Sequence, residues 1–206
     1  MSVVSASAAA VAPLAPATSL LLMPEGLEQG ITAQQMADLV AFVRSGNPRK
    51  EVAGNKPQLV PAGKDGVLML AARQAEIYGG EITFEPGFQN IGMWHGVDDQ
   101  IAWSFQVGRA GPYEVYLDYA SAANAAGNSF LLSVGDQSLT GGIPTTGDDW
   151  SHYKQMRVGT INLTAGTDRA ILRSKGPIRG ALIDLRTVAF APPGKTPQWP
   201  VGASTI

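Results

Sequence analysis

The sequence predicts an all-β fold, an antiparallel β-sandwich of the jelly-roll type, with a short helical appendage at its N-terminus. Between residues 100 and 135, apolar and polar residues alternate with a period of two, as in strands that bury one face. Turns that contain Gly, Pro or Asp separate the alternating segments. No helical pattern lies between them, so parallel β-α-β units are excluded and paired antiparallel sheets are expected.

Three alternating segments carry most of this prediction. The turns around them are Arg109–Pro112, Val134–Gln137 and Thr164–Thr167. Since successive side chains on a strand point to opposite faces, the apolar members should form the core. These are Ile101, Trp103, Phe105 and Val107, then Tyr113, Val115, Leu117 and Tyr119, and finally Phe130, Leu132 and Val134.

The chain divides into five predicted segments. Thr32 and Gln35 form a capping box before an apolar helical stripe at Met36, Leu39, Val40 and Val43, and Gly46 ends that helix. Gly and Pro then dominate a linker. The segments are a disordered Ala/Pro-rich tail (1–22), a helical segment (23–46), a linker (47–66), the sandwich (67–192) and an irregular C-terminal tail (193–206).

Composition excludes several functions. The 206 residues carry a formal net charge of −2 and no basic patch, which argues against nucleic acid as a partner. The absence of cysteine excludes disulfides and thiolate metal sites. Before Glu25 there is no charged residue, so the positive region of a secretory signal is missing, and Pro13 and Pro16 interrupt the apolar run, so no membrane span is expected.

Several short motifs occur in a fixed order along the chain. They are Ala75-Glu76, Asp99 with Trp103, Ala110–Tyr113, Thr146-Gly147 with Trp150, Leu163–Gly166 and Leu182–Asp184. By these motifs, the region from Gln74 to Pro192 resembles the carbohydrate-binding modules of families 6 and 35, within the galactose-binding-like jelly rolls. This resemblance implies a non-catalytic accessory domain of a larger periplasmic or extracellular protein, with a poly- or oligosaccharide as partner.

Two loops supply the side chains that a sugar site needs. Aromatic rings stack on the C–H faces of sugars, and planar polar groups bind the hydroxyls. By resemblance, Trp94 and Trp150 form the stacking platform, with His95 and Arg179 as polar contacts. Leu182 stands where the family has a ligand-binding Asn, so Arg179 would have to supply that contact. Alternatively, both tryptophans cover the edge of the core.

The resemblance also implies a structural calcium ion. In such modules, carboxylates from the first and last strands hold the ion, and here they would be Glu76 and Asp184. Gln74 lies two residues before Glu76, on the same strand face, and could add an amide oxygen. The alternative is that Glu76 pairs with Arg73 or Arg186 at a sheet edge.

A second resemblance concerns the segment before the linker. Leu22–Leu27 and the following helix resemble the C-terminal end of a cytochrome c domain of the planctomycete type, in which Met23 would be the axial haem ligand. Covalent haem attachment requires Cys-x-x-Cys-His, which this chain lacks, so haem is not expected. The segment is read as a remnant, or as a surface helix after a Pro turn.

The sequence contains no motif for independent catalysis. It has no Gly-x-Ser-x-Gly elbow, no His-Glu-x-x-His and no phosphate-binding loop of the Walker type, so an enzyme is not expected. The alternative function is a structural or protein-interaction domain of a periplasmic, haem-containing dehydrogenase-type protein. Exposure of Trp94 and Trp150 in one cleft would favour sugar binding over this alternative.

Overall fold

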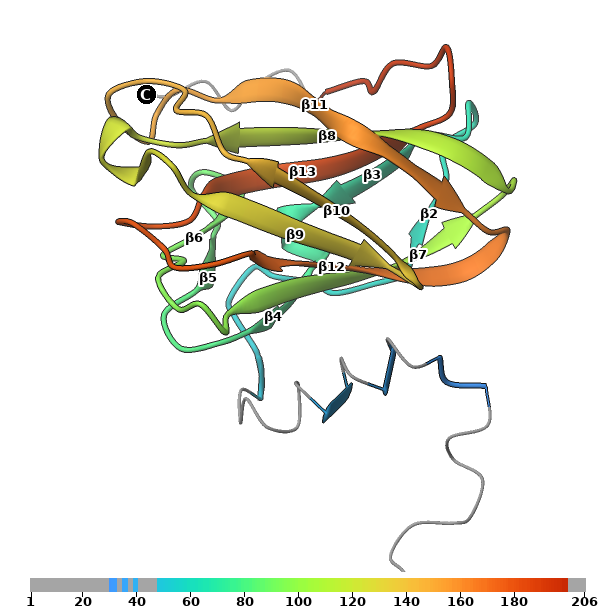
Figure 1. The fold of residues 1–206 in the computed structure, drawn as a ribbon, viewed down its shortest axis with the longest axis horizontal. Coiled ribbons are helices and arrows are strands. Elements are labelled where there is room, and N and C mark those ends of the chain that lie inside the picture. Colours follow the sequence, from blue (N-terminus) through green and yellow to red (C-terminus); the bar gives the residue numbers. More distant parts are fainter. Residues whose placement is uncertain (1–29, 33–34, 37–38, 41–47, 200–206) are drawn as a thin grey trace, which may run out of the picture. The chain divides into compact units, whose positions relative to one another are not determined.

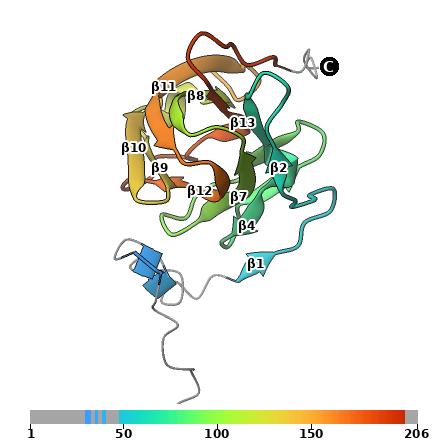
Figure 2. The ribbon, with the colours of Figure 1, turned by 90° about the vertical axis from the view of Figure 1, so that its right-hand side faces the viewer.

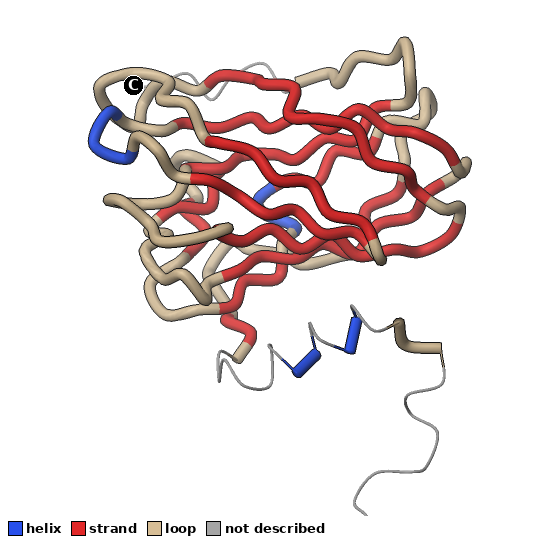
Figure 3. Tube along the Cα trace, in the orientation of Figure 1, coloured by secondary structure: helices blue, strands red, loops and turns tan. Residues whose placement is uncertain are grey.

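The computed structural model of the chain describes residues 30–32, 35–36, 39–40 and 48–199. Two β-sheets, almost entirely antiparallel, lie face to face and enclose one hydrophobic core (Figures 1 and 3). This arrangement confirms the predicted all-β jelly-roll sandwich.

The first sheet has seven strands. Six of them follow the order β1-β4-β7-β12-β9-β10, and β2 pairs with β7 in parallel. Their bounds are β1 (Arg49–Lys50), β2 (Val60–Pro61), β4 (Glu76–Tyr78), β7 (Gln100–Val107), β9 (Ser129–Val134), β10 (Gln137–Gly142) and β12 (Gly166–Ser174).

The second sheet has six strands in the order β11-β8-β13-β6-β5, and β3 pairs with β13. At one side of the sandwich β10 lies beside β11, so the two sheets approach each other there (Figure 2). The bounds are β3 (Leu68–Ala71), β5 (Thr83–Glu85), β6 (Asn90–Gly92), β8 (Gly111–Ala120), β11 (Lys154–Leu163) and β13 (Asp184–Ala191); two 3₁₀ turns, η1 (Ala72–Gln74) and η2 (Ala123–Ala125), complete the elements.

The core contains every apolar side chain that the alternation assigned to it. All eleven of these residues in β7, β8 and β9 are buried. The rings of Phe105 and Phe190 come from opposite sheets, and their centroids are 5.5 Å apart. Hydrophobic burial of the two inner faces therefore holds the sheets together.

The segment before the sandwich matches the sequence in part. The Thr32 backbone N–H donates to Gln35 Oε1 (2.9 Å) and the Gln35 N–H donates to Thr32 Oγ1 (3.1 Å), which confirms the capping box. The predicted tail (1–22), Met23 and Val43 lie outside the described residues. The segment predicted as a linker (47–66) also contributes to the fold, because its strands β1 and β2 pair with strands of the first sheet. In the part of the chain that the structure describes, no helix has the length and hydropathy of a membrane span.

Candidate functional site

Four loops meet at the end of the sandwich that carries η2 (Figure 3). They are the β6–β7 loop (93–99), the β8–β9 loop (121–128), the β10–β11 loop (143–153) and the β12–β13 loop (175–183). Backbone hydrogen bonds join them: Leu182 N–H to the Trp94 carbonyl (2.8 Å), Thr146 N–H to the Ser121 carbonyl (2.8 Å) and Ile143 N–H to the Asn128 carbonyl (2.8 Å). These bonds join the loops in two pairs, and the Asn128 side chain connects the pairs into one surface through Arg179.

Asn128 fixes the position of the β12–β13 loop. Its buried side chain donates to the carbonyls of Arg179 (3.0 Å) and Ala181 (2.8 Å) and accepts the Arg179 N–H (2.8 Å). His95 Nδ1 lies 2.9 Å from the Gly180 carbonyl. The structure thus brings the predicted residues His95 and Arg179, both exposed, to adjoining positions. Sequence reasoning missed Asn128; its only signal was an Asn directly after a loop glycine.

Trp94 does not offer a stacking surface, so the expectation of two exposed indoles is wrong for this residue. Its side chain is 0% exposed and belongs to the core. The indole N–H donates to the Asp99 carbonyl (3.3 Å). Met93 has a positive φ of 54°. This turn exposes Met93 and directs Trp94 inward, which the loop sequence alone did not reveal.

Asp99 holds the β6–β7 loop in this conformation. One carboxylate oxygen accepts the Gly80 N–H (3.2 Å) and the other accepts the Gly96 N–H (3.1 Å). A buried carboxylate bound to two backbone amides joins the loop to the β4–β5 turn. The Asp that the family motif placed four residues before Trp103 is therefore a structural residue of this loop.

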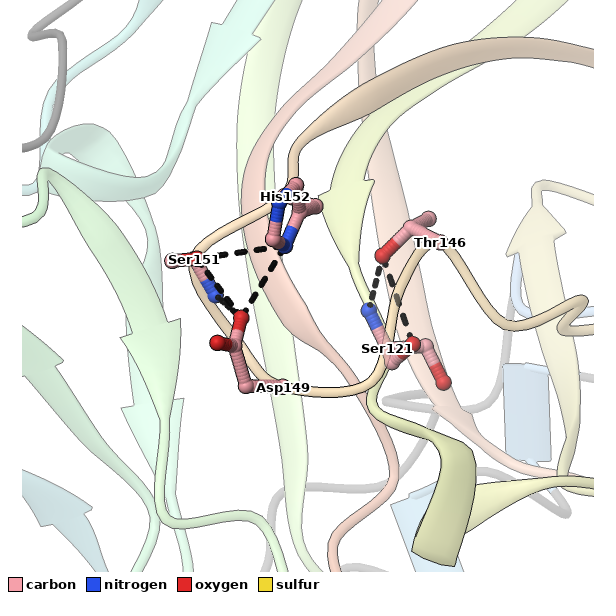
Figure 4. Close-up of polar contacts among 5 residues, drawn as sticks. All are labelled: Ser121, Thr146, Asp149, Ser151 and His152. Carbon is pink, nitrogen blue, oxygen red and sulfur yellow. Dashed lines mark hydrogen bonds and ion pairs between the residues drawn. The ribbon is translucent and has the colours of Figure 1, made fainter.

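Trp150 remains partly exposed in a turn that its neighbours stabilise. Asp149 Oδ1 accepts hydrogen bonds from the Ser151 hydroxyl (2.6 Å) and N–H (2.9 Å) and lies 3.0 Å from His152 Nδ1 (Figure 4). The Ser151 side chain, its N–H and His152 together lower the pKa of Asp149 to about 2. The Asp149 carboxylate therefore stabilises the turn that carries Trp150.

This Asp-Ser-His group is not built for catalysis. The Ser151 hydroxyl lies 3.2 Å from His152 Nδ1, the same ring nitrogen that faces Asp149. A hydrolytic triad needs the serine on one imidazole nitrogen and the carboxylate on the other. His152 therefore cannot accept a proton from Ser151 while Asp149 orients it.

Leu182 points into the core, where it is fully buried. The position that holds a ligand-binding Asn in the resembling modules thus presents no side chain at the loop surface. Arg179, three residues before Leu182 on the same loop, is exposed.

The three residues expected to hold calcium do not converge. The Glu76 carboxylate accepts hydrogen bonds from Arg169 Nη2 (2.6 Å) and from the Tyr78 hydroxyl, on the outer face of the seven-stranded sheet. Gln74 Oε1 accepts the Ala71 N–H (3.3 Å). Asp184 begins β13 in the other sheet, and its neighbour Leu185 points into the core, so Asp184 faces outward. Glu76 and Asp184 therefore lie on opposite outer faces of the sandwich.

Glu76 should make stability sensitive to acid. Its hydrogen bond from Arg169 lowers its pKa below the ordinary value of 4.5, although burial opposes this shift. A lowered folded-state pKa contributes stability above the unfolded-state pKa, and this contribution is lost as pH falls through the lower value. Urea denaturation from pH 5 to pH 3 should show a smaller loss of stability in Glu76→Gln than in wild type. Glu51→Gln, at an exposed position, is the control; equal pH slopes in wild type and Glu76→Gln would contradict the assignment.

No protein-family model and no curated protein matches the sequence. A GH26-CBM35 β-(1,4)-mannanase from Podospora anserina matches 65% of the chain, with 15% identity and a TM-score of 0.50. The match covers 29% of that enzyme, so the chain spans less than a third of its length. A family 35 carbohydrate-binding module from an environmental isolate matches 63% of the chain and 96% of its own length, with 19% identity and a TM-score of 0.50. At these identities the likeness shows that the chain shares the β-sandwich fold of these two structures.

Proposed function

We propose that this chain is a non-catalytic carbohydrate-binding domain whose site is the four-loop end of the sandwich. The observation that carries the proposal is the set of side chains on that surface. His95 and Arg179 are exposed at adjoining positions, and Trp150 is partly exposed in a loop that hydrogen bonds join to the same surface. The fold shared with a family 35 module supports it.

The mechanism we propose uses one indole rather than two. Trp150 would stack on the C–H face of a sugar ring, while Arg179 and His95 would bind hydroxyls. Since the hydroxyls must lose water on binding and few groups replace it, affinity should be modest. Such a domain would serve a larger periplasmic or extracellular protein, as the resemblance of the sequence implies.

A protein-interaction domain is the second candidate, and exposed apolar residues favour it. Met93 and Val97, on the β6–β7 loop, are 49% and 51% exposed. Both residues belong to one loop, and exposed apolar side chains of this kind can contribute to a docking surface when they form a contiguous patch. Under this alternative the loop end would contact another domain, and no sugar would bind there.

Glycan-array binding and tryptophan fluorescence distinguish the two candidates. For a glycan that binds the wild type, Trp150→Ala and Arg179→Ala should each weaken binding at least about tenfold, which corresponds to about 1.4 kcal/mol. Trp199→Ala removes a partly exposed tryptophan of the C-terminal tail and should leave binding unchanged. Failure of the wild type to bind any glycan, or equal binding by Trp150→Ala, would reject the proposed site.

A further inference from the structure

The outer face of the seven-stranded sheet carries a partly apolar patch outside the core. Ala102 of β7 is the register partner of Ile171 of β12, which is in turn the partner of Ser133 of β9. Tyr78 of β4 lies on the same face, two residues after Glu76, the partner of Ala102. Tyr78 and Ala102 are buried, although neither belongs to the hydrophobic core between the sheets. We call Tyr78, Ala102, Ile171 and Ser133 the outer-face patch.

A pocket of about 350 Å³ opens over the outer-face patch. Its wall includes two residues from before the sandwich, Gln35 and Leu39. They are four residues apart, and side chains with this spacing lie on one face of a helix. The other lining residues, all from the sheet and its turns, are Gln100, Gly135, Asp168, Arg169 and Arg173. The sheet therefore bounds the pocket on one side and a helical face bounds it on the other.

The segment that begins at Thr32 has an apolar face that lacks a complete partner. The capping box at its start is formed, and its described residues 35–36 and 39–40 are helical. Leu39 and Val40, which belong to the predicted apolar stripe, are 47% and 39% exposed. Such a stripe is stable in a helix when it is buried against another surface. Thr32–Ile206 form one compact unit, so the sandwich is the surface available to it.

We propose that the helix predicted from Thr32 to Gly46 docks on the outer-face patch, with Leu39 against Ala102 and Ile171. A helix of this length is about 20 Å long. The four strands β4, β7, β12 and β9 span about 15 Å from the first to the last, so one helix can cross all of them. The single methyl group of Ala102 lets a helix lie close to β7, the second of these strands.

The polar groups of this face permit such docking. Arg169 Nη2 donates to Glu76 Oε2 (2.6 Å) and to the Tyr78 hydroxyl (3.1 Å), so the charges nearest the outer-face patch already have partners. Covering a charge that is paired and hydrogen bonded costs far less than covering a lone one. Arg173 is half-buried and lies next to the last residue of β12, where its long side chain can keep the guanidinium in water.

Docking would fix the direction from which the chain enters the sandwich. The outer-face patch lies on strands, whereas the proposed sugar site lies on loops. The helix therefore docks whether or not the loop end binds sugar, and the tests below use no glycan.

The first test joins the two surfaces chemically. The chain contains no cysteine, so a double variant carries only the two thiols that are introduced. In the full-length Leu39→Cys/Ile171→Cys protein at high dilution, a short bismaleimide should link residues 39 and 171 within one molecule. Mass spectrometry of tryptic peptides measures the yield.

Tyr116 provides the control, because it lies on the outer face of the six-stranded sheet, between the core residues Val115 and Leu117. Leu39→Cys/Tyr116→Cys should give at most about a tenth of the yield of the first pair, since docking raises the effective concentration of only one pair of thiols. Equal yields for the two pairs would overturn the proposal. Links that join two copies of the chain, in place of links within one copy, would also overturn it.

The second test measures trypsin cleavage after Arg44, which requires the helix to leave the sheet. Leu39→Gln removes the apolar contact at almost unchanged helix propensity, and Ile171→Thr alters only the sheet side. Each variant should be cleaved at least about fivefold faster than the wild type, because proteolysis follows the population of the open form. Leu59→Gln, at a position that is 50% exposed and outside both surfaces, should leave the rate unchanged.

The two variants together decide the outcome. Faster cleavage in Leu39→Gln alone would mean that the helix does not use this face of the sheet, and would reject the docking. Rates equal to that of the wild type in both variants would reject it as well.

Discussion

Trp94→Ala is expected to lower the free energy of unfolding by about 3–5 kcal/mol, the range typical of replacing a buried aromatic side chain by alanine. Trp94 is fully buried and packs with the core. Its indole N–H also donates to the Asp99 carbonyl, so the substitution leaves a cavity and an acceptor without its donor. Urea denaturation monitored by circular dichroism measures the change.

Trp150→Ala is the matched control for this prediction. The Trp150 side chain is partly exposed in a loop, so its removal should cost less than about 1 kcal/mol. The two tryptophans were equivalent in the sequence-based expectation, and the structure separates them into a core residue and a surface residue. Equal losses of stability in the two variants would contradict this separation.

Gly79→Ala should destabilise the domain by more than about 2 kcal/mol. Gly79 has a φ of +142°, and a Cβ atom there would lie 2.1 Å from Asp99 Oδ1 and 2.8 Å from Ile82 Cγ2. The Asp99 carboxylate would have to move from the amides of Gly80 and Gly96 that it now binds. The β6–β7 loop would then lose its attachment to the β4–β5 turn.

Gly80→Ala provides the comparison, because a Cβ atom at this adjacent glycine meets nothing within 4 Å. Its melting temperature should stay within a few degrees of that of the wild type, while Gly79→Ala should melt markedly lower. A Gly79→Ala protein as stable as Gly80→Ala would show that Asp99 does not require this glycine.

The strands were predictable because their information is local. The alternation at Ile101, Trp103 and Phe105 specifies which face of the strand is apolar, whichever strand lies beside it. In a sandwich that face is the buried one, as it is here. The capping box at Thr32 was predictable for the same reason, since its partners are three residues apart.

The loop residues were not predictable in this way, because no periodicity governs the direction of a loop side chain. The positive φ of Met93 and the carboxylate of Asp99 turn Trp94 inward. Asn128 acts on Arg179, 51 residues away in the sequence. Such contacts exist only once the loops are brought to the same end of the fold.

The expected calcium residues illustrate the same limit. The spacing of Gln74 and Glu76 predicts one shared strand face, but Gln74 lies in the 3₁₀ turn η1, before β4 begins at Glu76. Spacing also does not say which side chains lie opposite a residue. In the fold Glu76 meets Arg169, and Asp184 meets Glu85.

By itself, the sequence determined the fold class, the strands of the core and the absence of cysteine chemistry, because alternation and composition are local properties of the chain. Only the tertiary structure decided which tryptophan is exposed, which carboxylates are neighbours and which loops form one surface. These depend on strand order and register, which bring together residues that lie far apart in the sequence.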